Sequence, residues 1–208
     1  MTLRQWLGLG LGFAGLLLVV GEGTAPQSLG KGLGTALEQA LKHGDLAYKG
    51  GRTLYLQDVS GVKAPRVVFV AAASSTAKAF RSAVGAGLAL LKGGGARQLL
   101  VASLLPQPLD ESHAQALPAA VGDALYVYRH TKPSAPAASK LQRVSLACGA
   151  SDAAALRAGL ERGEAMAAGV ALARECANRP GNHCTPSFLA DEARRLGKGH
   201  DLEVQVLG

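Results

Sequence analysis

The stretch RVVFVAA, residues 66–72, continues from one arginine into an unbroken apolar run. Successive side chains of a strand point to opposite faces, so a strand that is apolar at every position must be covered on both sides. Strands of this kind belong to sheets that lie between two layers of helices. The stretch therefore predicts an α/β fold, a three-layer sandwich with a largely parallel or mixed sheet.

The sequence on either side supports this fold class, because short apolar runs alternate with longer segments of helical periodicity. Turn-forming glycines at 44, 50–51 and 93–95 separate these segments. The expected strands cover residues 16–20, 53–57, 66–71, 98–103, 143–147 and 202–207. The expected helices cover residues 29–43, 76–92, 117–128, 152–177 and 186–196.

Composition bounds the function. The chain has 208 residues, of which 48% are hydrophobic and only 4% aromatic, which does not suit base-stacking surfaces. Its net charge is +7, and the basic residues are scattered along the chain. The densest basic group, Arg129, Lys132, Lys140 and Arg143, surrounds the proline-containing loop KPSAPAASK, and no nucleic-acid motif accompanies it. The three cysteines are too few for a disulfide framework, which favours reduced thiols in a cytosolic protein.

The N-terminal run WLGLGLGFAGLLLVV, residues 6–20, leaves two interpretations open. It resembles the apolar region of a signal peptide, but a membrane span needs about 20 residues, and the best cleavage site, at residues 23–25, is followed by Pro26. The alternative is a buried strand at 16–20 entered through a glycine-rich lead. We expect no membrane association.

Residues 10–15 match G-x-G-x-x-G letter for letter. A dinucleotide site needs a strand before this motif and a helix after it, so that phosphates meet a helix N-terminus. Only nine residues precede the motif here, and an apolar strand is expected to follow it. A glycine-rich apolar leader explains the same letters.

Cys176, His183 and Cys184 offer three zinc ligands at C-x7-C spacing. Structural zinc takes four ligands, usually in closely spaced cysteine pairs, and Cys148 would have to be supplied from the end of a strand. A catalytic Cys-His pair needs facing side chains, which adjacent residues do not readily provide. A small buried cysteine and a loop histidine are the simpler interpretation.

The segment around these residues predicts a helix-loop-helix hinge. The helix at 152–177, with Ser151 as its N-cap, would be about 39 Å long, enough to bridge two domains. Asn178 is expected to adopt the left-handed turn that ends it, and Pro180 prevents its continuation. Thr185 is the expected N-cap of the next helix, with Pro186 as its first residue.

The string ARECANRPGNHCTPSFLADEARRL, residues 173–196, resembles a segment of the cytosolic leucyl aminopeptidases, approximately A-R-x-L-x-N-x-P-P-N-x-x-T-P-x-x-L-A. The matching residues are Asn178, Pro180, Asn182, Thr185, Pro186, Leu189 and Ala190, whereas Gly181 replaces the second proline. Earlier segments, such as AFRSAVGAGLALLK and YRHTKP, agree in order. The family's glycine-rich turn after RVVFV is replaced by residues 71–74, AAAS.

This resemblance implies three parts. Residues 1–150 would form an N-terminal macro-like α/β domain, residues 151–177 a linker helix, and residues 178–208 the beginning of a truncated catalytic domain. The family assembles as homo-hexamers in the cytoplasm and removes N-terminal residues from peptides. It uses two divalent metal ions, manganese, zinc or magnesium, to bind the substrate amine and activate a water.

The family's metal-binding strings, of the types V-G-K-G-x-T-F-D-S-G-G and N-T-D-A-E-G-R, do not occur here, and residues 197–199, GKG, lack the required continuation. No residue is therefore assigned to catalysis, to a cofactor or to a metal. We expect the segment to contribute assembly and substrate access to a metal-dependent aminopeptidase and to be inactive alone.

Two other functions remain open. Macro-like folds bind ADP-ribose-type ligands, and the candidate loop is residues 21–23, although Glu22 would repel a diphosphate. The basic surface would permit weak DNA association, as in some family members, with strong salt dependence.

Overall fold

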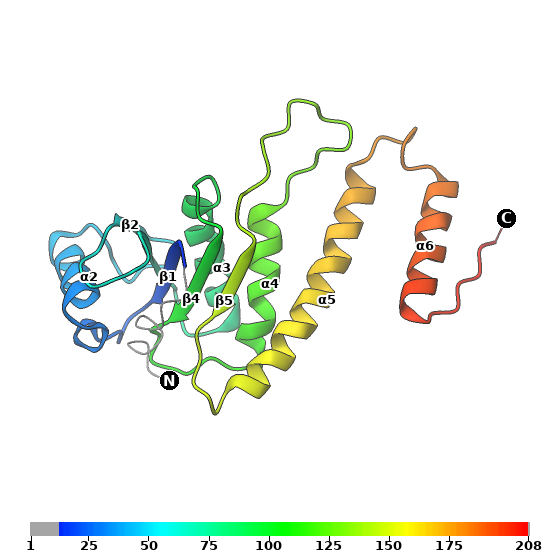
Figure 1. Cartoon of the computed structure of the whole chain (residues 1–208). Helices are drawn as coiled ribbons and strands as arrows, with labels where there is room; N and C mark the ends of the chain where they lie inside the picture. The colour runs from blue at the N-terminus through cyan, green and yellow to red at the C-terminus, as the bar shows by residue number, and fades with distance from the viewer. Residues whose placement is uncertain (1–12, 208) are drawn as a thin grey trace. The chain divides into compact units, whose positions relative to one another are not determined.

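A computed structural model of the chain describes residues 13–207. Its strands are β1 (Gly15–Val20), β2 (Thr53–Gln57), β3 (Arg66–Ala71), β4 (Gln98–Ser103) and β5 (Arg143–Leu146). Its helices are the 3-10 helix η1 (Pro26–Leu29) and the α-helices α2 (Lys31–His43), α3 (Ala77–Leu91), α4 (Glu111–Leu125), α5 (Ala153–Asn178) and α6 (Pro186–His200), as Figure 1 shows.

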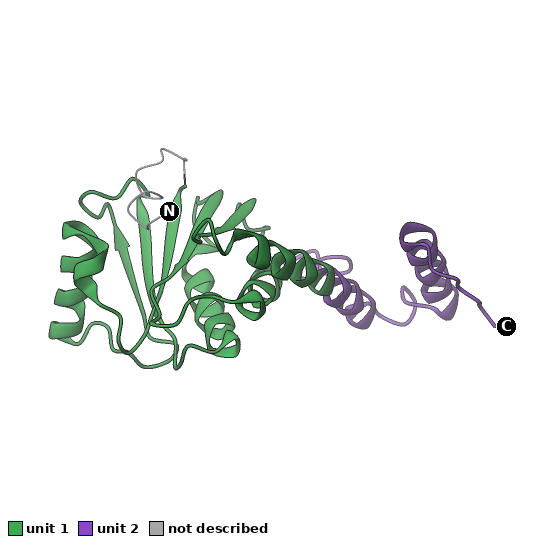
Figure 2. Ribbon diagram, turned by 90° about the horizontal axis from the view of Figure 1, so that it is seen from below, with its two compact units in different colours: residues 1–126, 137–167 green, residues 127–136, 168–208 purple. Residues whose placement is uncertain are grey.

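The chain divides into two compact units, coloured separately in Figure 2. The first comprises residues 1–126 and 137–167 and contains the sheet. The second comprises residues 127–136 and 168–208, and so includes the end of α5 and all of α6.

The sheet has five strands in the order β2-β3-β1-β4-β5. β1 pairs in parallel with both β3 and β4, and β4 pairs in parallel with β5. Only β2, at one edge, runs antiparallel to its neighbour β3. The predicted mixed, largely parallel sheet is confirmed.

Helices cover both faces of this sheet. On one face, side chains of β1, β3 and β4 pack against Leu33 and Leu37 of α2. On the other face, alternate side chains of the same strands pack against Phe80 and Leu88 of α3 and Leu117 of α4. The predicted three layers are therefore present, and the run at residues 66–71 forms a strand buried on both sides.

The N-terminal leader is only partly within the described residues. Positions 1–12, which include Gly10 and Gly12 of the G-x-G-x-x-G match, lie outside them. Gly15, its last glycine, begins β1, so a strand and not a helix follows the motif. The expected buried strand at 16–20 is confirmed.

One helix begins earlier than predicted. We expected a helix at 117–128, with Pro118 near its start, but α4 begins at Glu111 and contains Pro118 in its interior. Asp110 caps it by accepting a hydrogen bond from the backbone N–H of His113, at 3.0 Å. The cap supplies the start signal, and the proline is tolerated inside the helix.

The predicted helix at 152–177 is confirmed as α5, but Ser151 and Asn178 do not have the capping roles that were predicted for them. Ser151 is not its N-cap: the hydroxyl donates to Asp152, and the carbonyl of Asp152 accepts from Leu156. Asn178 is the last helical residue and is not among the non-glycine residues with positive φ. Its side chain donates to the carbonyl of Arg174 instead.

The second predicted hinge helix, 186–196, runs on to His200, and residues 202–207 do not form the predicted strand. Asp201, the residue that follows α6, has a φ of 52°, and the Leu202 N–H then donates to the carbonyl of Gly197. A strand requires a hydrogen-bonding neighbour, and the described residues supply none to this segment. The predicted helix-strand fragment is therefore a helix followed by an irregular segment.

Within the first unit, α5 packs closely on α4 through two glycines. A Cβ added to Gly159 would lie less than 3.0 Å from the backbone carbonyl oxygen of Glu111, and one added to Gly163 would lie less than 3.0 Å from that of Gln115. Real Cβ atoms essentially never fall under this separation. An ion pair between Arg162 and Glu111, at 2.6 Å, spans the same contact. The glycines therefore set how closely the two helices approach.

We predict that Gly163→Ala lowers the free energy of unfolding by about 1–3 kcal/mol, because a backbone carbonyl cannot yield as a side chain can. Gly169→Ala, in the same helix with no atom within 4 Å of the added Cβ, serves as the control. It should raise stability by about 0.5–1 kcal/mol through helix propensity. Urea unfolding followed by circular dichroism measures both, and equal effects would contradict the packing argument.

Candidate functional site

Polar groups gather at the carboxyl ends of the parallel strands, the edge where ligands usually bind in open α/β sheets. Thr24 and His113 are the buried polar residues of the described chain, and both lie at this edge. Thr24 follows β1, and His113 lies in the first turn of α4, after β4. This edge is therefore the first place to look for chemistry.

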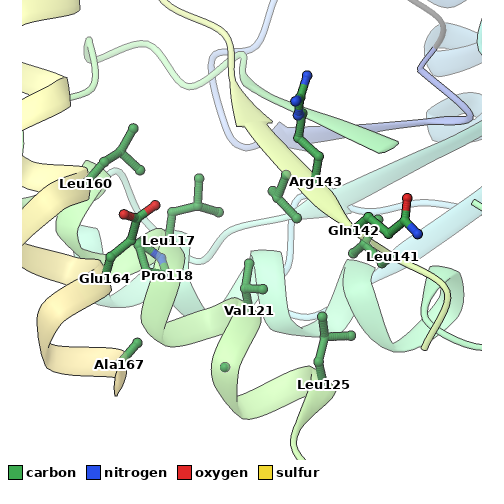
Figure 3. Close-up of a pocket in the computed structure, with 12 residues that line it drawn as sticks. Leu117, Pro118, Val121, Leu125, Leu141, Gln142, Arg143, Leu160, Glu164 and Ala167 are labelled. Atoms are coloured by element: carbon green, nitrogen blue, oxygen red, sulfur yellow. The ribbon is translucent and has the colours of Figure 1, made fainter. Parts of the chain in front are cut away.

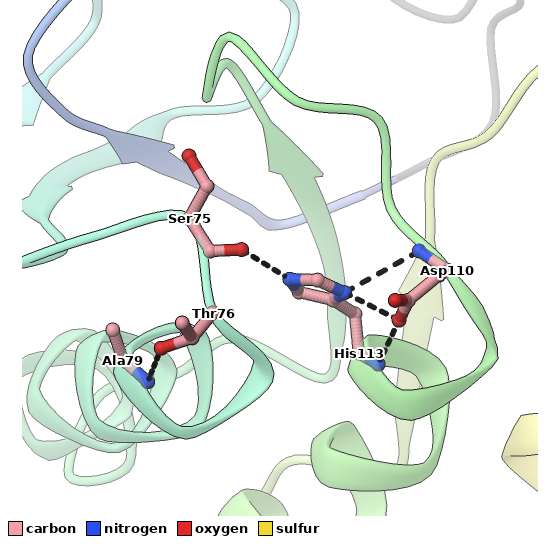
Figure 4. A network of polar contacts seen from close by, with 5 residues as sticks. All are labelled: Ser75, Thr76, Ala79, Asp110 and His113. Carbon is pink, nitrogen blue, oxygen red and sulfur yellow. Dashed lines mark hydrogen bonds and ion pairs between the residues drawn. The ribbon is translucent and has the colours of Figure 1, made fainter.

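His113 makes two short contacts through its ring nitrogens, drawn in Figure 4. Nδ1 lies 2.6 Å from Oδ1 of Asp110, and Nε2 lies 2.9 Å from the backbone oxygen of Ser75. The ring also meets the Phe80 ring edge-on, with centroids 5.6 Å apart. The Asp110 backbone N–H also lies 3.3 Å from Nδ1, so the ring takes part in the capping of α4.

This arrangement resembles two members of a catalytic triad but lacks a nucleophile. Ser75 presents its backbone carbonyl to the ring, and the nearby hydroxyls of Ser74 and Thr76 bond each other at 3.0 Å. The network instead ties the loop after β3 to the start of α4. Sequence reasoning missed it, although Asp110 and His113 have the spacing of a capping box.

The hydrogen bond from His113 holds the pKa of the Asp110 carboxyl below its ordinary value, assisted by the backbone N–H of His113. A carboxyl whose folded pKa is lowered stabilises the fold above its unfolded pKa and loses that contribution as the pH falls through the folded pKa. Two thirds of the Asp110 side chain is exposed, at 66%, so solvent screens the pair.

We predict that Asp110→Asn, which keeps a good N-cap, destabilises the protein at about pH 7 by no more than about 1 kcal/mol. The difference from wild type should shrink as the pH is lowered from about 5 to about 3, because the wild-type carboxylate becomes protonated there. Urea unfolding across this range tests it. If the difference in unfolding free energy between the two proteins stays constant with pH, the charge of Asp110 does not contribute to stability.

The loop after β1, residues 21–23, is the candidate cradle for a diphosphate, and its interior is filled. The Thr24 hydroxyl accepts from the Gly21 N–H and donates to the carbonyl of Leu104, both at 2.9 Å. A Cβ on Gly21 would lie 2.8 Å from Leu105, and one on Gly23 would lie 2.8 Å from Pro106. The glycines are therefore explained by the packing of the loop after β4, and their geometry does not favour an ADP-ribose site.

The hinge residues lie in the second unit. Thr185 caps α6 by accepting from the Phe188 N–H, and Pro186 is the first helical residue, as predicted. His183 faces the His130 ring, with centroids 5.4 Å apart. Cys176 and Cys184 carry free thiols that are half-buried. No group of three or more His, Cys, Asp or Glu side chains within residues 13–207 could hold a metal ion.

A cavity of about 420 Å³ lies in the first unit among α4, α5 and the start of β5 (Figure 3). Its lining is mainly apolar, with Leu117, Val121 and Leu160 among the side chains that Figure 3 shows. Arg143 and Glu164 are its charged members. It contains neither a nucleophile nor a pair of carboxylates, so it has no evident chemistry. The described chain also contains no helix with both the length and the apolarity to cross a membrane.

The comparisons with known proteins agree with one another. The model of the cytosol aminopeptidase family, N-terminal domain, matches residues 18–134, more than half of the chain. This chain belongs to the cytosol aminopeptidase family. A probable cytosol aminopeptidase of Methylibium petroleiphilum is 54% identical over 192 residues, 92% of this chain and 39% of that protein.

Further relatives of this cytosol aminopeptidase family member extend the comparison. A cytosol aminopeptidase of Pseudomonas aeruginosa is 36% identical over 205 residues, covering 93% of this chain and 41% of its own. A mutant of tomato leucine aminopeptidase has the same fold, with a TM-score of 0.68, 21% identity, and coverage of 91% of this chain and 40% of its own. The chain thus spans about two fifths of the length of the curated relatives it matches.

Proposed function

We propose that this chain is the N-terminal portion of a metal-dependent leucyl aminopeptidase, which as a whole releases N-terminal amino acids from peptides. The observation that carries the proposal is the 54% identity to a probable cytosol aminopeptidase across nearly the whole chain. The family model that matches is that of the N-terminal domain, which agrees with this assignment.

The two divalent ions implied by the family resemblance, manganese, zinc or magnesium, do not fit the described residues. A metal site of this kind needs clustered carboxylate or imidazole ligands, and residues 13–207 offer no group of three. We therefore assign no step of the reaction to these residues. The ions, and the hydroxide that they would supply, belong to the remaining part of the proposed enzyme.

The contribution we propose for this segment is assembly and access to the active site. In the proposed enzyme, a homo-hexamer in the cytoplasm, a macro-like α/β unit would serve as a rigid scaffold. Two cores that share the strands β1, β3 and β4 give the first unit the rigidity that this role needs. The helix-loop-helix segment in the second unit would connect it to the catalytic part.

We predict that the 208-residue chain, supplied with manganese and a leucine chromogenic amide, releases no product above the metal-only rate. The reason is that its described residues provide no ligand group for the ion. Absorbance of the released chromophore measures it. Turnover that co-purifies with the chain and disappears on chelation would contradict this division of labour.

A chimera tests the positive half of the proposal. In it, residues of the Methylibium petroleiphilum relative that align with this chain are replaced by those of this chain. At 54% identity we expect the chimera to assemble as the unaltered relative does and to hydrolyse the same amide within about tenfold of its rate. Light scattering and chromophore release measure the two properties. A folded chimera that does not assemble would refute the scaffold role.

A further inference from the structure

Two thiols lie at the two ends of the connection between α5 and α6. Cys176 is in the last turn of α5, and Cys184 directly precedes Thr185, the N-cap of α6. Seven residues separate them in the sequence, yet the Cys184 thiol is among the groups that raise the pKa of Cys176, which indicates that the two lie near each other. Both belong to the same compact unit.

Backbone turns bring the thiols together. The Arg179 N–H bonds to the carbonyl of Cys176 at 3.3 Å, and the N–H groups of His183 and Cys184 bond to the carbonyl of Pro180 at 2.8 and 2.9 Å. The chain therefore turns twice within the connection and returns toward the end of α5.

A side-chain contact brings the two helix ends together independently of the thiols. The Arg179 guanidinium lies over the Phe188 ring, in the first turn of α6, 4.6 Å from its centroid. The Glu192 carboxylate, one turn further along α6, acts electrostatically on Cys176. The end of α5 and the beginning of α6 are thus in contact.

The ligand count favours a covalent bond over a metal. A structural zinc site takes four ligands, and these two thiols are not part of any group of three or more metal-binding side chains in the described chain. Two free, half-buried thiols at the two ends of a connection that turns back on itself are candidates for a disulfide. They remain accessible to a small reagent, since neither is fully buried.

We propose that Cys176 and Cys184 are a reversible oxidation site, forming an intramolecular disulfide that fixes the α5–α6 connection. The oxidant is a low-molecular-weight disulfide, RSSR. One cysteine thiolate attacks RSSR, forms a mixed disulfide and releases RS⁻; the second thiolate then attacks the protein sulfur and releases another RS⁻. The two protons lost by the cysteines are taken up by the two leaving thiolates, so that dithiol and RSSR give disulfide and two RSH.

The surroundings act on the reactivity of one of the two thiols. Burial, reinforced by the neighbouring Cys184 thiol and by Glu192, raises the pKa of Cys176, which leaves it less often as the thiolate. This inference does not depend on the proposed function, because it concerns only the reactivity of this connection.

The test uses the full chain in buffers of varying reduced-to-oxidised glutathione ratio, with acid quenching and alkylation of the remaining thiols. Trypsin places both cysteines in one peptide, residues 175–194, because it does not cleave between Arg179 and Pro180. Cys148 falls in a separate peptide, residues 144–157. Oxidation should leave the first peptide unalkylated and lighter by about 2 Da than its reduced form, while the second remains alkylated.

Three variants separate the pair from the third cysteine. Cys148→Ser should oxidise at the same glutathione ratio as wild type. Cys176→Ser should accumulate the glutathione adduct on Cys184, because no resolving thiol is present. Cys184→Ser should accumulate the corresponding adduct on Cys176. Full alkylation of residues 175–194 at every glutathione ratio, or equal adduct formation on Cys148, would overturn the proposal.

Amide hydrogen exchange tests the effect on the connection. Oxidation should slow the exchange of residues 177–185 at least severalfold in wild type and in Cys148→Ser, and leave it unchanged in Cys184→Ser. A disulfide that forms without slowing this exchange would refute the claim that the bond fixes the connection.

Discussion

The described structure depends on the complete burial of β1. All six of its residues are buried, it hydrogen-bonds to β3 on one side and β4 on the other, and its alternate side chains enter both cores. Each fully buried leucine or valine contributes about 1.5–3 kcal/mol, so this single strand supplies a large share of the gross stabilisation. Because β1 is central and parallel to both neighbours, the loops after β1, β3 and β4 meet at one edge, and the buried polar residues Thr24 and His113 lie there.

The sequence predicts best those elements whose signals are local and strong. Continuous apolar runs predict strands at 16–20, 66–71 and 98–103, because only a sheet covered on both faces accommodates them. The start of α4 was predicted wrongly, because the capping box that begins it has His113 at a position where Glu or Gln is usual. The segment 202–207 alternates apolar and polar residues, but such a pattern becomes a strand only beside another strand.

The contacts that define the polar network and the thiol pair were less accessible from sequence. His113 bonds to Ser75, 38 residues earlier, and no local pattern announces such a pairing. The two hinge cysteines were recognised as possible zinc ligands or, more simply, as small buried residues, and not as partners of each other. The two turns at Cys176–Arg179 and Pro180–Cys184 bring the segment that carries Cys184 back toward the end of α5, which a seven-residue separation alone does not predict.

Each unit is stabilised by a different kind of internal contact. This difference determines how much a bond between the two thiols could add to the order of the second unit. In the first unit, acidic side chains such as Glu111 and Asp123 form ion pairs across helices that already rest on a core. In the second unit, Gly197 is the single buried residue among those described, and Leu189 is 47% exposed. Segments with few buried apolar contacts open locally at low free-energy cost. The α5–α6 connection therefore relies on the Thr185 cap, the Arg179–Phe188 contact and the thiol pair. A covalent bond has its largest effect on order where no hydrophobic core already restricts the chain.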